Sequence, residues 1–512
     1  MTKTQPVICV ATHHASIGEL LSDAEFLGLA NREGFLVELR LDFFNDLTDA
    51  SLDRALAVFT PNALVTYRHP SEGGKRPGVS DDERLRVLQR AADHGVKFID
   101  IEARTSRDGF NKRGATLILS YHDFESSPDV KTLQSIWQSI ASSPDVDVVK
   151  MAVMPKTVAD TFAAHSFLQA IKNGANPGAQ TILLCMGEAG LWSRVLAGYF
   201  GAPFTYARGE GASGTAPGQP TWRELDSLYR FRQIDSSWRV YAVIGNPVGH
   251  SLSPLMHNTA FEELGIPAVY LPFKVEGNPV EFIREFGRVL NGVSVTIPHK
   301  ETIVACCAEV DAGVRTIGAM NTLNPITIVA DGSKTWAGSN TDAAAAADSL
   351  EAGLGTLQGK HVLVIGAGGA ARAVAVGVKE RGALVSVLNR TRERAETLAK
   401  EVGGVAVSFD DLAHLKIDAI VNTTPLGMHP NVDASPLEEN QIPKDGLVFD
   451  TVYNPFRTKL LELAEKRGCT TIEGLSMFIG QGVRQFELWT GKKAPRELMH
   501  RVVLEALKKR RQ

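Results

Sequence analysis

Strand-like and helix-like segments alternate regularly through the first ~210 residues, and this alternation limits the possible folds more than any other feature. Amphipathic stretches such as 80–95 and 158–174 separate eight short runs rich in β-branched and apolar residues: 7–12, 35–42, 63–68, 96–103, 116–123, 146–153, 181–187 and 203–207. Alternation of this kind predicts a parallel α/β sheet, and eight units predict a closed (β/α)8 barrel.

Composition and charge exclude several classes of function. The chain has 512 residues, too many for one core, and its content of 44% hydrophobic and 22% charged residues is typical of a globular protein. The formal net charge is -4 with no basic tract, so nucleic acids and anionic membranes are poor partners. No apolar run approaches the ~18 residues of a membrane span.

The cysteines predict a reducing compartment. Five cysteines form no CxxC pair, and their number is odd, which is typical of reduced thiols rather than a disulfide or zinc framework. The first residues run directly into a strand-like segment without an apolar signal core. We therefore expect a cytoplasmic protein. No His, Cys or carboxylate cluster has ligand spacing, so we expect no metal.

Polar residues stand near the ends of several of the eight runs. Glu38 and Arg40 lie near the end of the second, Arg68 ends the third, His122 lies near the end of the fifth, and Lys150 lies within the sixth. Active sites of such barrels are assembled from the C-terminal ends of the strands, so these side chains are expected to converge.

Lys150 is flanked by apolar residues, and this position needs an explanation. Burial disfavours the ammonium form, and a neutral amine can attack a ketone to form a Schiff base. His122 would then be a general base, and Arg40, Arg68 and Arg194 offer planar forks for a carboxylate. Taken singly, each has a simpler interpretation: a lysine paired at a strand, a structural histidine, and an ion pair between Arg40 and Glu38.

The motifs of this half, over roughly residues 5–225, closely resemble the type I 3-dehydroquinate dehydratases: VELRLD, TYRHPSEGG, LSYHDF, VVKMAVMP, MGEAGLWSRV and APGQPT. The resemblance implies a Schiff base between Lys150 and the C3 ketone of 3-dehydroquinate, with His122 moving protons during loss of water. It implies Glu72 as a further active-site acid. It also implies substrate contacts from Glu38, Arg40, Arg68, Arg194 and Gln219.

One position departs from that family. Many relatives read Ser-Ala-Pro-Gly-Gln where this chain has Thr215 before Ala216 and Gln219. Thr215 keeps a hydroxyl, and we carry the substrate contact over to it on that ground.

A second half begins after a short polar hinge at 235–237, where a new strand-like run starts. Residues 360–390 read strand, glycine-rich turn, helix, strand. Gly366 permits a sharp turn, and Gly368 and Gly369 let the backbone approach a pyrophosphate at the next helix N-terminus, with Ala371 at the third glycine position. We predict a barrel at 1–235, a substrate domain at 238–344, a Rossmann domain at 345–472, and helices at 473–512 that return to the substrate domain.

The end of the second strand of this motif favours NADP over NAD. NAD-specific sites place an acid there, whereas this chain has Asn389, Arg390 and Thr391, with Arg394 one turn later. Arginines at this point suit a 2′-phosphate. The alternative is that Arg390 and Arg394 are solvated charges at a helix start.

Three further segments suggest a site for a small hydroxylated acid. Pro254 suits a first helical position with Ser253 as its cap, and Ser251 and Ser253 could accept a carboxylate. Lys300 ends a strand-like run. Asp342 alone would most simply cap a helix, but beside Lys300 it could orient an amine that protonates a carbonyl oxygen as hydride arrives.

The second half, over about residues 240–510, closely resembles the shikimate dehydrogenases in the order of its motifs: HSLSP, NGVSVTIPHK, IGAMNTL, GSNTD, GAGGAAR, NRTRERA, NTTPLGM, DTVYNP and GLSMFIGQG. The resemblance implies Lys300 and Asp342 as the catalytic pair. It implies substrate contacts from Ser251, Ser253, Thr296, Asn321, Tyr453 and Gln481. It implies NADP contacts from Gly366, Ala367, Gly368, Gly369, Ala370, Asn389, Arg390, Thr391, Arg394, Thr451 and Gly474.

The two resemblances together predict an enzyme that dehydrates 3-dehydroquinate to 3-dehydroshikimate and then reduces this ketone to shikimate with NADPH. An alternative is quinate dehydrogenase activity in the second half, although the serines at 251 and 253 and Thr296 favour shikimate. A different class of alternative is a sensor that binds a pathway metabolite without turnover. The full set of Lys150, His122, Lys300 and Asp342 argues against a sensor, because binding alone needs no proton transfer.

Overall fold

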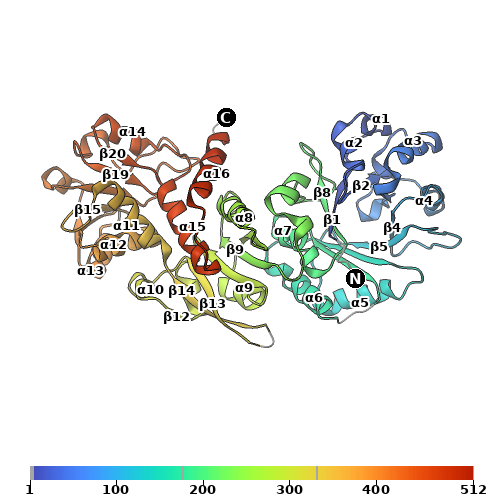
Figure 1. Ribbon diagram of the computed structural model, residues 1–512, viewed down its shortest axis with the longest axis horizontal. Helices are drawn as coiled ribbons and strands as arrows, with labels where there is room; N and C mark the ends of the chain where they lie inside the picture. The colour runs from blue at the N-terminus through green and yellow to red at the C-terminus, as the bar shows by residue number, and fades with distance from the viewer. Residues whose placement is uncertain (1–4, 175–177, 330–331, 511–512) are drawn as a thin grey trace. The chain divides into compact units, whose positions relative to one another are not determined.

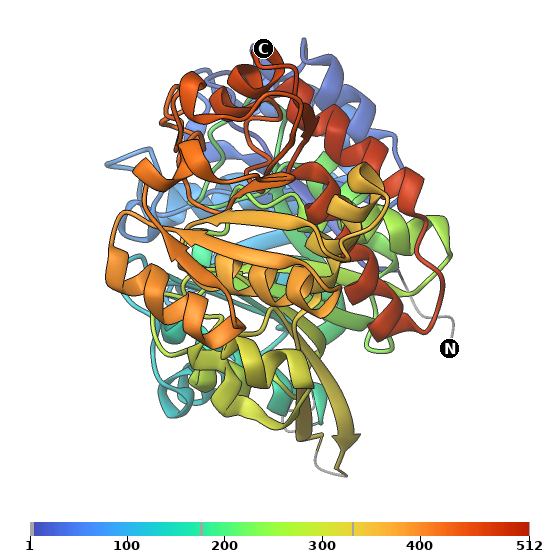
Figure 2. The ribbon, with the colours of Figure 1, turned by 90° about the vertical axis from the view of Figure 1, so that its left-hand side faces the viewer.

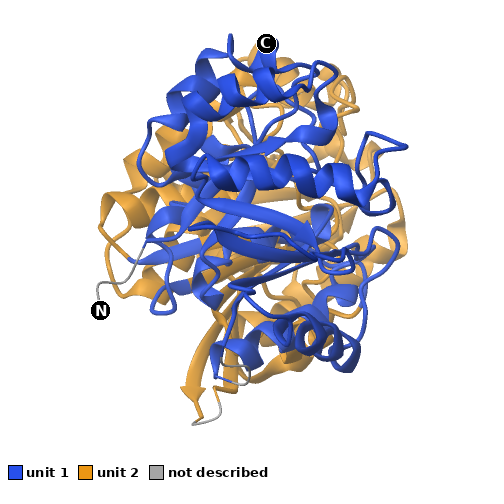
Figure 3. Cartoon of the chain, turned by 90° about the vertical axis from the view of Figure 1, so that its right-hand side faces the viewer, with its two compact units in different colours: residues 1–239, 267–269, 273–277 blue, residues 240–266, 270–272, 278–512 orange. Residues whose placement is uncertain are grey.

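The structure is a computed structural model, and it describes residues 5–174, 178–329 and 332–510 (Figures 1 and 2). The chain divides into two compact units, which Figure 3 shows in different colours. The first holds residues 1–239, 267–269 and 273–277, and the second holds 240–266, 270–272 and 278–512.

The first unit is built on an eight-stranded parallel sheet, drawn in blue to green in Figure 1. The order is β7-β6-β5-β4-β3-β2-β1-β8, so neighbours in the chain are neighbours in the sheet, apart from β8, which returns to β1. The strands are β1 (Val7–Ala11), β2 (Phe35–Arg40), β3 (Ala63–Thr66), β4 (Phe98–Glu102), β5 (Thr116–His122), β6 (Val148–Val153), β7 (Gln180–Cys185) and β8 (Phe204–Arg208).

All eight predicted strands are therefore present, and the (β/α)8 class is confirmed. Among the described residues no ladder joins β7 to β8, so the barrel is nearly closed rather than fully hydrogen-bonded around its ring. Every residue of β2 and of β6 is buried, because such strands have a packed interior on one face and helices on the other. The helices of this unit are α1 (Ile17–Leu20), α2 (Ala24–Ala30), α3 (Asp49–Phe59), α4 (Asp81–Asp93), α5 (Val130–Ala141), α6 (Phe162–Lys172) and α7 (Leu191–Val195).

The first sheet of the second unit has six strands in the order β10-β9-β11-β13-β14-β12. It is mixed: β11 runs parallel to β9 and antiparallel to β13. Its strands are β9 (Arg239–Gly245), β10 (Ala268–Lys274), β11 (Leu290–Val295), β12 (Cys307–Val310), β13 (Thr322–Ile328) and β14 (Lys334–Ser339). The accompanying helices are α8 (Ser253–Glu263), α9 (Pro279–Phe286) and α10 (Ala312–Ile317).

The second sheet is wholly parallel and appears in orange in Figure 2. Its order is β17-β16-β15-β18-β19-β20, so the chain starts at the centre, builds one side, and then crosses over between β15 and β18 to build the other. This is the Rossmann order. The strands are β15 (His361–Ile365), β16 (Leu384–Leu388), β17 (Val405–Val407), β18 (Ala419–Asn422), β19 (Leu447–Asp450) and β20 (Thr470–Ile472).

Alternate residues of this sheet enter two different cores. Val362 and Val364 of β15 pack in one core with α11 (Thr341–Leu354), α12 (Gly369–Glu380) and α13 (Arg392–Val402). Leu363 and Ile365 pack in the other, with α14 (Lys459–Lys466). Helices thus cover both faces, as a parallel sheet requires. Beyond this sheet, α15 (Leu475–Thr490) packs along α11, and α16 (Arg496–Lys509) packs on α8.

Candidate active sites

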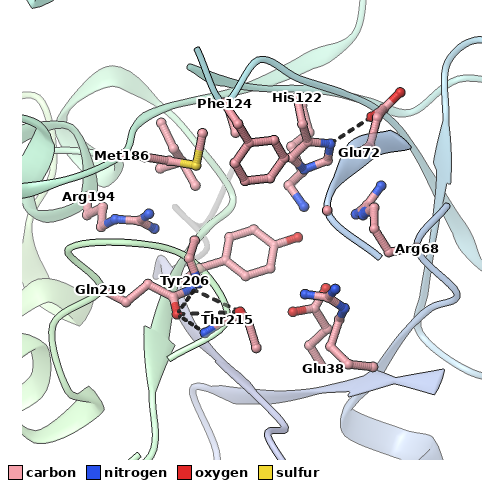
Figure 4. Close-up of a pocket in the computed structure, with 16 residues that line it drawn as sticks. Glu38, Arg68, Glu72, His122, Phe124, Met186, Arg194, Tyr206, Thr215 and Gln219 are labelled. Carbon is pink, nitrogen blue, oxygen red and sulfur yellow. Dashed lines mark hydrogen bonds and ion pairs between the residues drawn. The ribbon is translucent and has the colours of Figure 1, made fainter. Parts of the chain in front are cut away.

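One cavity in the barrel brings together all nine residues predicted there (Figure 4). Its empty volume, which includes space open to solvent, is about 490 Å³. Strands β2, β5, β6, β7 and β8 supply part of its lining, and the segments after β3, β5, β7 and β8 supply the rest. The predicted residues on its wall are Glu38, Arg40, Arg68, Glu72, His122, Lys150, Arg194, Thr215 and Gln219.

Lys150 is held within this cavity by two contacts. Its side chain is only 6% exposed, and its Nζ donates a 2.8 Å hydrogen bond to Oδ2 of Asp100 on β4. The same Nζ lies 4.3 Å from the ring centroid of Tyr206 on β8, within the range of a cation–π interaction. The amine is therefore fixed in place while it stays open to the cavity.

Asp100 is shared between two cations. Nη2 of Arg68 lies 2.9 Å from the same Oδ2 that contacts Lys150, and Oγ of Ser120 donates to Oδ1 at 2.6 Å. Burial opposes ionisation of Asp100, but the charges of Arg68 and Lys150 outweigh it and hold the pKa of this carboxyl well below its usual value. Asp100 is thus a fixed negative charge beside the amine.

His122 and Glu72 form a second pair in the cavity, joined by the dashed line in Figure 4. Nδ1 of His122 lies 2.9 Å from Oε2 of Glu72. Burial, together with the charges of Arg68 and Lys150, lowers the pKa of His122 well below its usual value, so the imidazole is neutral near pH 7. Burial raises the pKa of Glu72 to about 7 against the opposing charge of Arg68. The pair can therefore accept and return a proton near neutral pH.

Arg194 presents a buried charge to the cavity and has no counterion within the described part of the chain. The residue is 1% exposed, and neither Nε nor Nη1 has a hydrogen-bond partner among the described residues. Burial lowers the pKa of Arg194 to about 10. Buried guanidinium groups are normally paired, because an uncompensated charge in the interior is costly. An anion in this cavity would complete the site.

The segment 214–219 forms a loop that binds its own side chain. Oε1 of Gln219 accepts hydrogen bonds from the backbone N–H of Thr215 at 2.8 Å and of Ala216 at 3.2 Å. Gly218 has φ +69°, and a Cβ there would lie 2.4 Å from the backbone of Gly187, so only glycine fits. The loop therefore holds Thr215 and Gln219 at the cavity wall in a fixed shape.

Arg40 contacts a different acid from the one suggested by its spacing. Its Nε and Nη2 donate to the two oxygens of Asp42, both at 2.9 Å, whereas Oε1 of Glu38 accepts from Oγ1 of Thr66 at 2.8 Å. The alternative of an Arg40–Glu38 ion pair is therefore wrong. Nη1 of Arg40 takes no part in the contact with Asp42.

The glycine-rich turn of the second unit fits a dinucleotide. Gly366 has φ +118°, and a Cβ there would lie 2.5 Å from Oγ1 of Thr423, so the close turn needs glycine. Gly368 occupies the N-cap position of α12 without a side-chain cap, Gly369 begins the helix, and added Cβ atoms at both would meet open space. A pyrophosphate can therefore approach the free N–H groups here, at the point where the strand order reverses. Ala367 and Ala370 complete this turn.

The arginines after β16 are available to a ligand. Arg390 and Arg394 are exposed, and their side chains have no ion pair or hydrogen bond with the part of the chain that the structure describes. Between them Arg392 pairs with Glu396 at 2.9 Å. Asn389 donates from Nδ2 to the carbonyl of Thr391, which shapes the turn between β16 and α13.

Lys300 and Asp342 are in direct contact. Nζ of Lys300 lies 2.5 Å from Oδ2 of Asp342, which stands in the first turn of α11. The alternative that Asp342 caps this helix is wrong, because Oδ1 of Asn340 accepts from the N–H groups of Asp342 and Ala343. Asp342 is consequently free to bind the amine.

Asn321 bonds to Thr341, the residue before Asp342. It is buried, its Oδ1 accepts from the N–H of Thr341 at 2.9 Å, and its Nδ2 donates to Oγ1 of Thr341 at 2.9 Å. A second N–H of the amide is left for a ligand. Gln485 of α15, which the sequence analysis did not identify, donates from Nε2 to the carbonyl of Asn321 at 3.1 Å.

The start of α8 differs from the prediction. The helix begins at Ser253 with Leu252 at the N-cap position, so Ser253 is not the cap and Pro254 is not the first helical residue. The hydroxyl of Ser251 instead accepts from the N–H of Ser253 at 3.2 Å. The chain enters the helix through a turn closed by Ser251, a geometry that the local sequence does not reveal.

The remaining predicted residues of the second unit each contact a nearby segment. Tyr453 stacks on Phe478 with ring centroids 4.5 Å apart, and Gln481 donates to the carbonyl of Phe478 at 2.9 Å. Gly474 packs so closely on the backbone of Thr451 that a Cβ would lie 2.6 Å from its carbonyl oxygen. Thr296 precedes the turn that leads to Lys300, with its N–H bonded to the carbonyl of Ile244 at 2.9 Å.

Three residues beside the barrel cavity were not predicted: Asp100, Glu102 and Tyr206. Asp100 and Glu102 are two apart on β4 and so point to the same face. Both are fully buried, which places two carboxylates on the packed inner side of the strand. Two acids alternating with apolar residues in a barrel strand are a signal that could have identified them.

Within the described residues, no group of three or more His, Cys, Asp or Glu side chains could hold a metal ion, and no helix has the length and apolar character needed to cross a membrane. The prediction that neither site uses a metal stays a prediction.

Comparisons with family models match almost the whole chain. Residues 8–236 match the type I 3-dehydroquinase model. Residues 243–323 match the shikimate dehydrogenase substrate binding domain, 348–450 match shikimate / quinate 5-dehydrogenase, and 474–504 match the shikimate 5′-dehydrogenase C-terminal domain.

Individual relatives agree with these models. A chloroplastic bifunctional 3-dehydroquinate dehydratase/shikimate dehydrogenase from Arabidopsis thaliana is 36% identical over 98% of this chain and 85% of its own length. An NADP(+) shikimate dehydrogenase from Methanocaldococcus jannaschii is 38% identical over 54% of this chain and 100% of its own. A crystal structure of shikimate dehydrogenase with NADP+ matches 54% of this chain and 97% of its own, with 36% identity and a TM-score of 0.50.

Proposed function

Because this chain belongs to the family of bifunctional 3-dehydroquinate dehydratase/shikimate dehydrogenases, we propose that Lys150 and Lys300 are the central groups of two consecutive reactions. The chain is a dehydratase and an NADP-dependent shikimate dehydrogenase of the shikimate pathway. The first reaction converts 3-dehydroquinate to 3-dehydroshikimate, and the second reduces 3-dehydroshikimate to shikimate. The observation that carries the assignment of residues is that Lys150, the His122–Glu72 pair and the unpaired Arg194 face one cavity.

In the first reaction Lys150 attacks the ketone. Its neutral amine adds to the carbonyl carbon, water leaves, and a Schiff base forms. The positive charge of the protonated imine makes the hydrogen on the adjacent carbon acidic. Loss of that proton gives an enamine. Its nitrogen lone pair then re-forms the imine, while the electrons of its carbon–carbon double bond form a new double bond to the next carbon, whose bond to the hydroxyl breaks. Hydrolysis of the imine then frees the product and the amine of Lys150.

His122 moves the protons of this sequence. Its neutral imidazole takes the proton from the carbon beside the imine and can pass it to the departing hydroxyl, which leaves as water. Glu72 contacts Nδ1 and so orients the ring and stabilises it when it is protonated.

Other residues hold the substrate. Arg194 binds its carboxylate, since its buried guanidinium has no counterion among the described residues. The polar loop at Thr215 and Gln219 and the side chains of Glu38, Arg40 and Arg68 bind the hydroxyls or orient the acids around them.

In the second reaction Lys300 protonates the carbonyl oxygen. Asp342 orients the amine, because its Oδ2 lies 2.5 Å from Nζ. Ser251, Ser253, Thr296, Asn321, Tyr453 and Gln481 hold the substrate. Bound NADPH supplies the hydride. The turn at Gly366–Ala370, the segment Asn389–Arg394, Thr451 and Gly474 would hold this cofactor, with Arg390 and Arg394 on the 2′-phosphate.

We place this chemistry in the cytoplasm, because all five cysteines are free thiols. The relative from Arabidopsis thaliana is named chloroplastic, which concerns that protein. Nucleic acids are not expected as partners. Cell fractionation would test the compartment.

Consumption of NADPH by the purified chain with 3-dehydroquinate as sole substrate tests the function. Loss of NADPH requires both sites, because the barrel must first make the ketone that the second unit reduces. If NADPH is not consumed, 3-dehydroshikimate is supplied instead. Recovery would show that the barrel is inactive, and continued absence of turnover would contradict the reductase assignment.

A further inference from the structure

A row of five buried charges of alternating sign runs from helix α4 to the amine of Lys150. Its members, called here the buried charge chain, are Arg84, Glu102, Arg68, Asp100 and Lys150, and each is at most 5% exposed. Of these five residues, Arg68 and Lys150 belong to the described lining of the cavity, and the other three do not. The buried charge chain therefore connects the cavity to Arg84, which lies outside its lining.

Arg84 is locked at the far end of this chain. Its Nε donates to the carbonyl of Tyr67 at 2.9 Å, its Nη1 pairs with Asp81, and its Nη2 pairs with Oε2 of Glu102. These partners come from the end of β3, the start of α4 and the end of β4. The guanidinium is thus held on three sides, and its fork cannot turn away from Glu102 without losing several bonds.

Glu102 links Arg84 to Arg68. Its other oxygen, Oε1, lies 3.1 Å from Nη1 of Arg68 and also accepts from the N–H of His69 at 2.9 Å. Arg68 in turn holds Asp100 both directly, through Nη2 at 2.9 Å, and through Ser120, whose hydroxyl accepts from Nη1 and donates to Oδ1 of Asp100. Glu102 and Asp100 thus share one guanidinium, through Nη1 and Nη2 respectively.

Arg68 and Lys150 compete for one oxygen of Asp100. Nη2 of Arg68 and Nζ of Lys150 lie 2.9 and 2.8 Å from its Oδ2. A firm bond from Arg68 neutralises much of that oxygen's charge and leaves less to stabilise the ammonium form of Lys150. Schiff-base formation needs the neutral amine, so this division of charge bears directly on the chemistry.

We propose that Arg84 is a positioning residue for dehydration: by compensating Glu102 it keeps Arg68 on Asp100, and so limits how strongly Asp100 favours the ammonium form of Lys150. This inference rests on the proposed role of Lys150. Without Arg84, the buried Glu102 would draw Arg68 toward itself, and Asp100 would be left to the lysine. Without the charge of Glu102, Arg68 would bind Asp100 more firmly, with the opposite effect.

Other charged and titratable groups also face Lys150, and both variants leave them in place. They come from β1, β2, β5, β8, α7 and the segment after β3: Cys9, Glu38, Arg40, His122, Tyr206, Arg194 and Glu72. Because the charge of Glu102 also raises the pKa of Glu72, the variants are compared in a Glu72→Gln background. There, a shift that reverses sign between a variant of Arg84 and a variant of Glu102 reports on the buried charge chain.

The test compares Arg84→Met, Glu102→Gln and the double variant in the full chain. Two readouts are taken from pH 5 to 9: kcat/KM for dehydration, and the rate at which cyanoborohydride traps substrate on the lysine. Arg84→Met should move the acidic limb of both profiles to higher pH by about half a unit or more, and Glu102→Gln should move it to lower pH. The double variant should return close to the original profile, because both changes cancel.

Arg86→Met is the matched control, since Arg86 lies on the same helix but is about half exposed and pairs with Glu83 and Asp49. It should leave both profiles unchanged. Shifts of Arg84→Met and Glu102→Gln in the same direction, or a lower rate without a shift, would overturn the proposal. If Arg84→Met does not fold, Arg84→Gln, which keeps hydrogen-bond donors without the charge, takes its place in the same comparison. Trapping that persists in Lys150→Met would instead sink the proposed function, so the two failures are distinguishable.

Discussion

Asp342 binds Lys300 through a 2.5 Å contact, while Asn340, two residues earlier, makes the helix cap that Asp342 could have made. The two side chains therefore have different roles at the start of α11. The N-cap holds the helix end, and the next carboxylate is left for the amine.

This division predicts two different outcomes for two neighbouring substitutions. Asp342→Asn should lower kcat for reduction by roughly 10²-fold, because the amine loses the charge that aims it, with dehydration unchanged. Asn340→Ala should cost about 1 kcal/mol in the free energy of unfolding of the second unit. Steady-state kinetics and urea denaturation measure the two. Equal loss of reduction in both variants, with equal destabilisation, would contradict separate roles.

Lys150→Met should abolish dehydration and spare reduction. The variant removes the one lysine among the described residues that line the cavity, so the rate should fall by at least about 10³-fold. Reduction of 3-dehydroshikimate by the same preparation serves as the control for the rest of the chain. Intact-mass spectrometry after cyanoborohydride should find the substrate adduct in the parent chain alone. A dehydration rate within tenfold of the parent's would rule out the lysine as nucleophile.

Glu72 should give dehydration a dependence on pH near neutrality. Burial raises the pKa of Glu72 to about 7, so the carboxylate that supports protonated His122 is present above pH 7 and lost as the pH falls through 7. Glu72→Gln cannot ionise, and it should lower kcat by about tenfold or more while removing the component of the profile near pH 7. Kinetics from pH 5.5 to 9 would show this. A variant profile that keeps the same midpoint would assign it to another group.

Arg194→Met should weaken substrate binding and stabilise the free protein. Loss of a charge-assisted bond to the substrate carboxylate should raise KM for dehydration by roughly 10–100-fold. Because the guanidinium is buried and no described residue pairs with it as a counterion, its replacement by an apolar side chain should raise the Tm of the ligand-free chain. Arg223→Met, at an exposed arginine of the same unit, is the control for both measurements. A lower Tm with unchanged KM would assign Arg194 to the fold alone.

Arg390 and Arg394 should decide between the two nicotinamide cofactors. Replacing both with alanine should raise KM for NADPH by about tenfold or more, with little change for NADH, because only NADPH carries the 2′-phosphate. Arg392→Ala is the matched control, as Arg392 lies between them but pairs with Glu396. Equal effects on both cofactors would place the two arginines outside the phosphate site.

The positions of the strands and helices along the chain could be predicted from the sequence, because they follow from the periodicity of its apolar residues. The eight β-branched runs became β1 to β8, with their ends shifted by three residues or fewer, since each strand must bury both faces. The strand–turn–helix at 360–390 was likewise predictable, because Gly366 and the helix start at Gly369 follow from backbone geometry.

Local partners were harder to predict, because they depend on atoms brought from distant segments. Arg40 pairs with Asp42 and not with Glu38, and Asn340 rather than Asp342 caps α11. In each case two acceptors lie within reach along the chain, and the tertiary structure selects one. Asp100 had no motif of its own, and its place beside Lys150 follows only from the closing of the barrel.

The loop closed by Gln219 has a thermodynamic consequence. Its side chain already satisfies the N–H groups of Thr215 and Ala216, and Gly218 is packed against Gly187, before any substrate arrives. The conformational entropy of this loop is therefore lost when the chain folds, and not when the substrate binds. Binding to the barrel should accordingly carry only the small entropic penalty of a rigid receptor, and this penalty should grow if Gln219 is shortened to alanine.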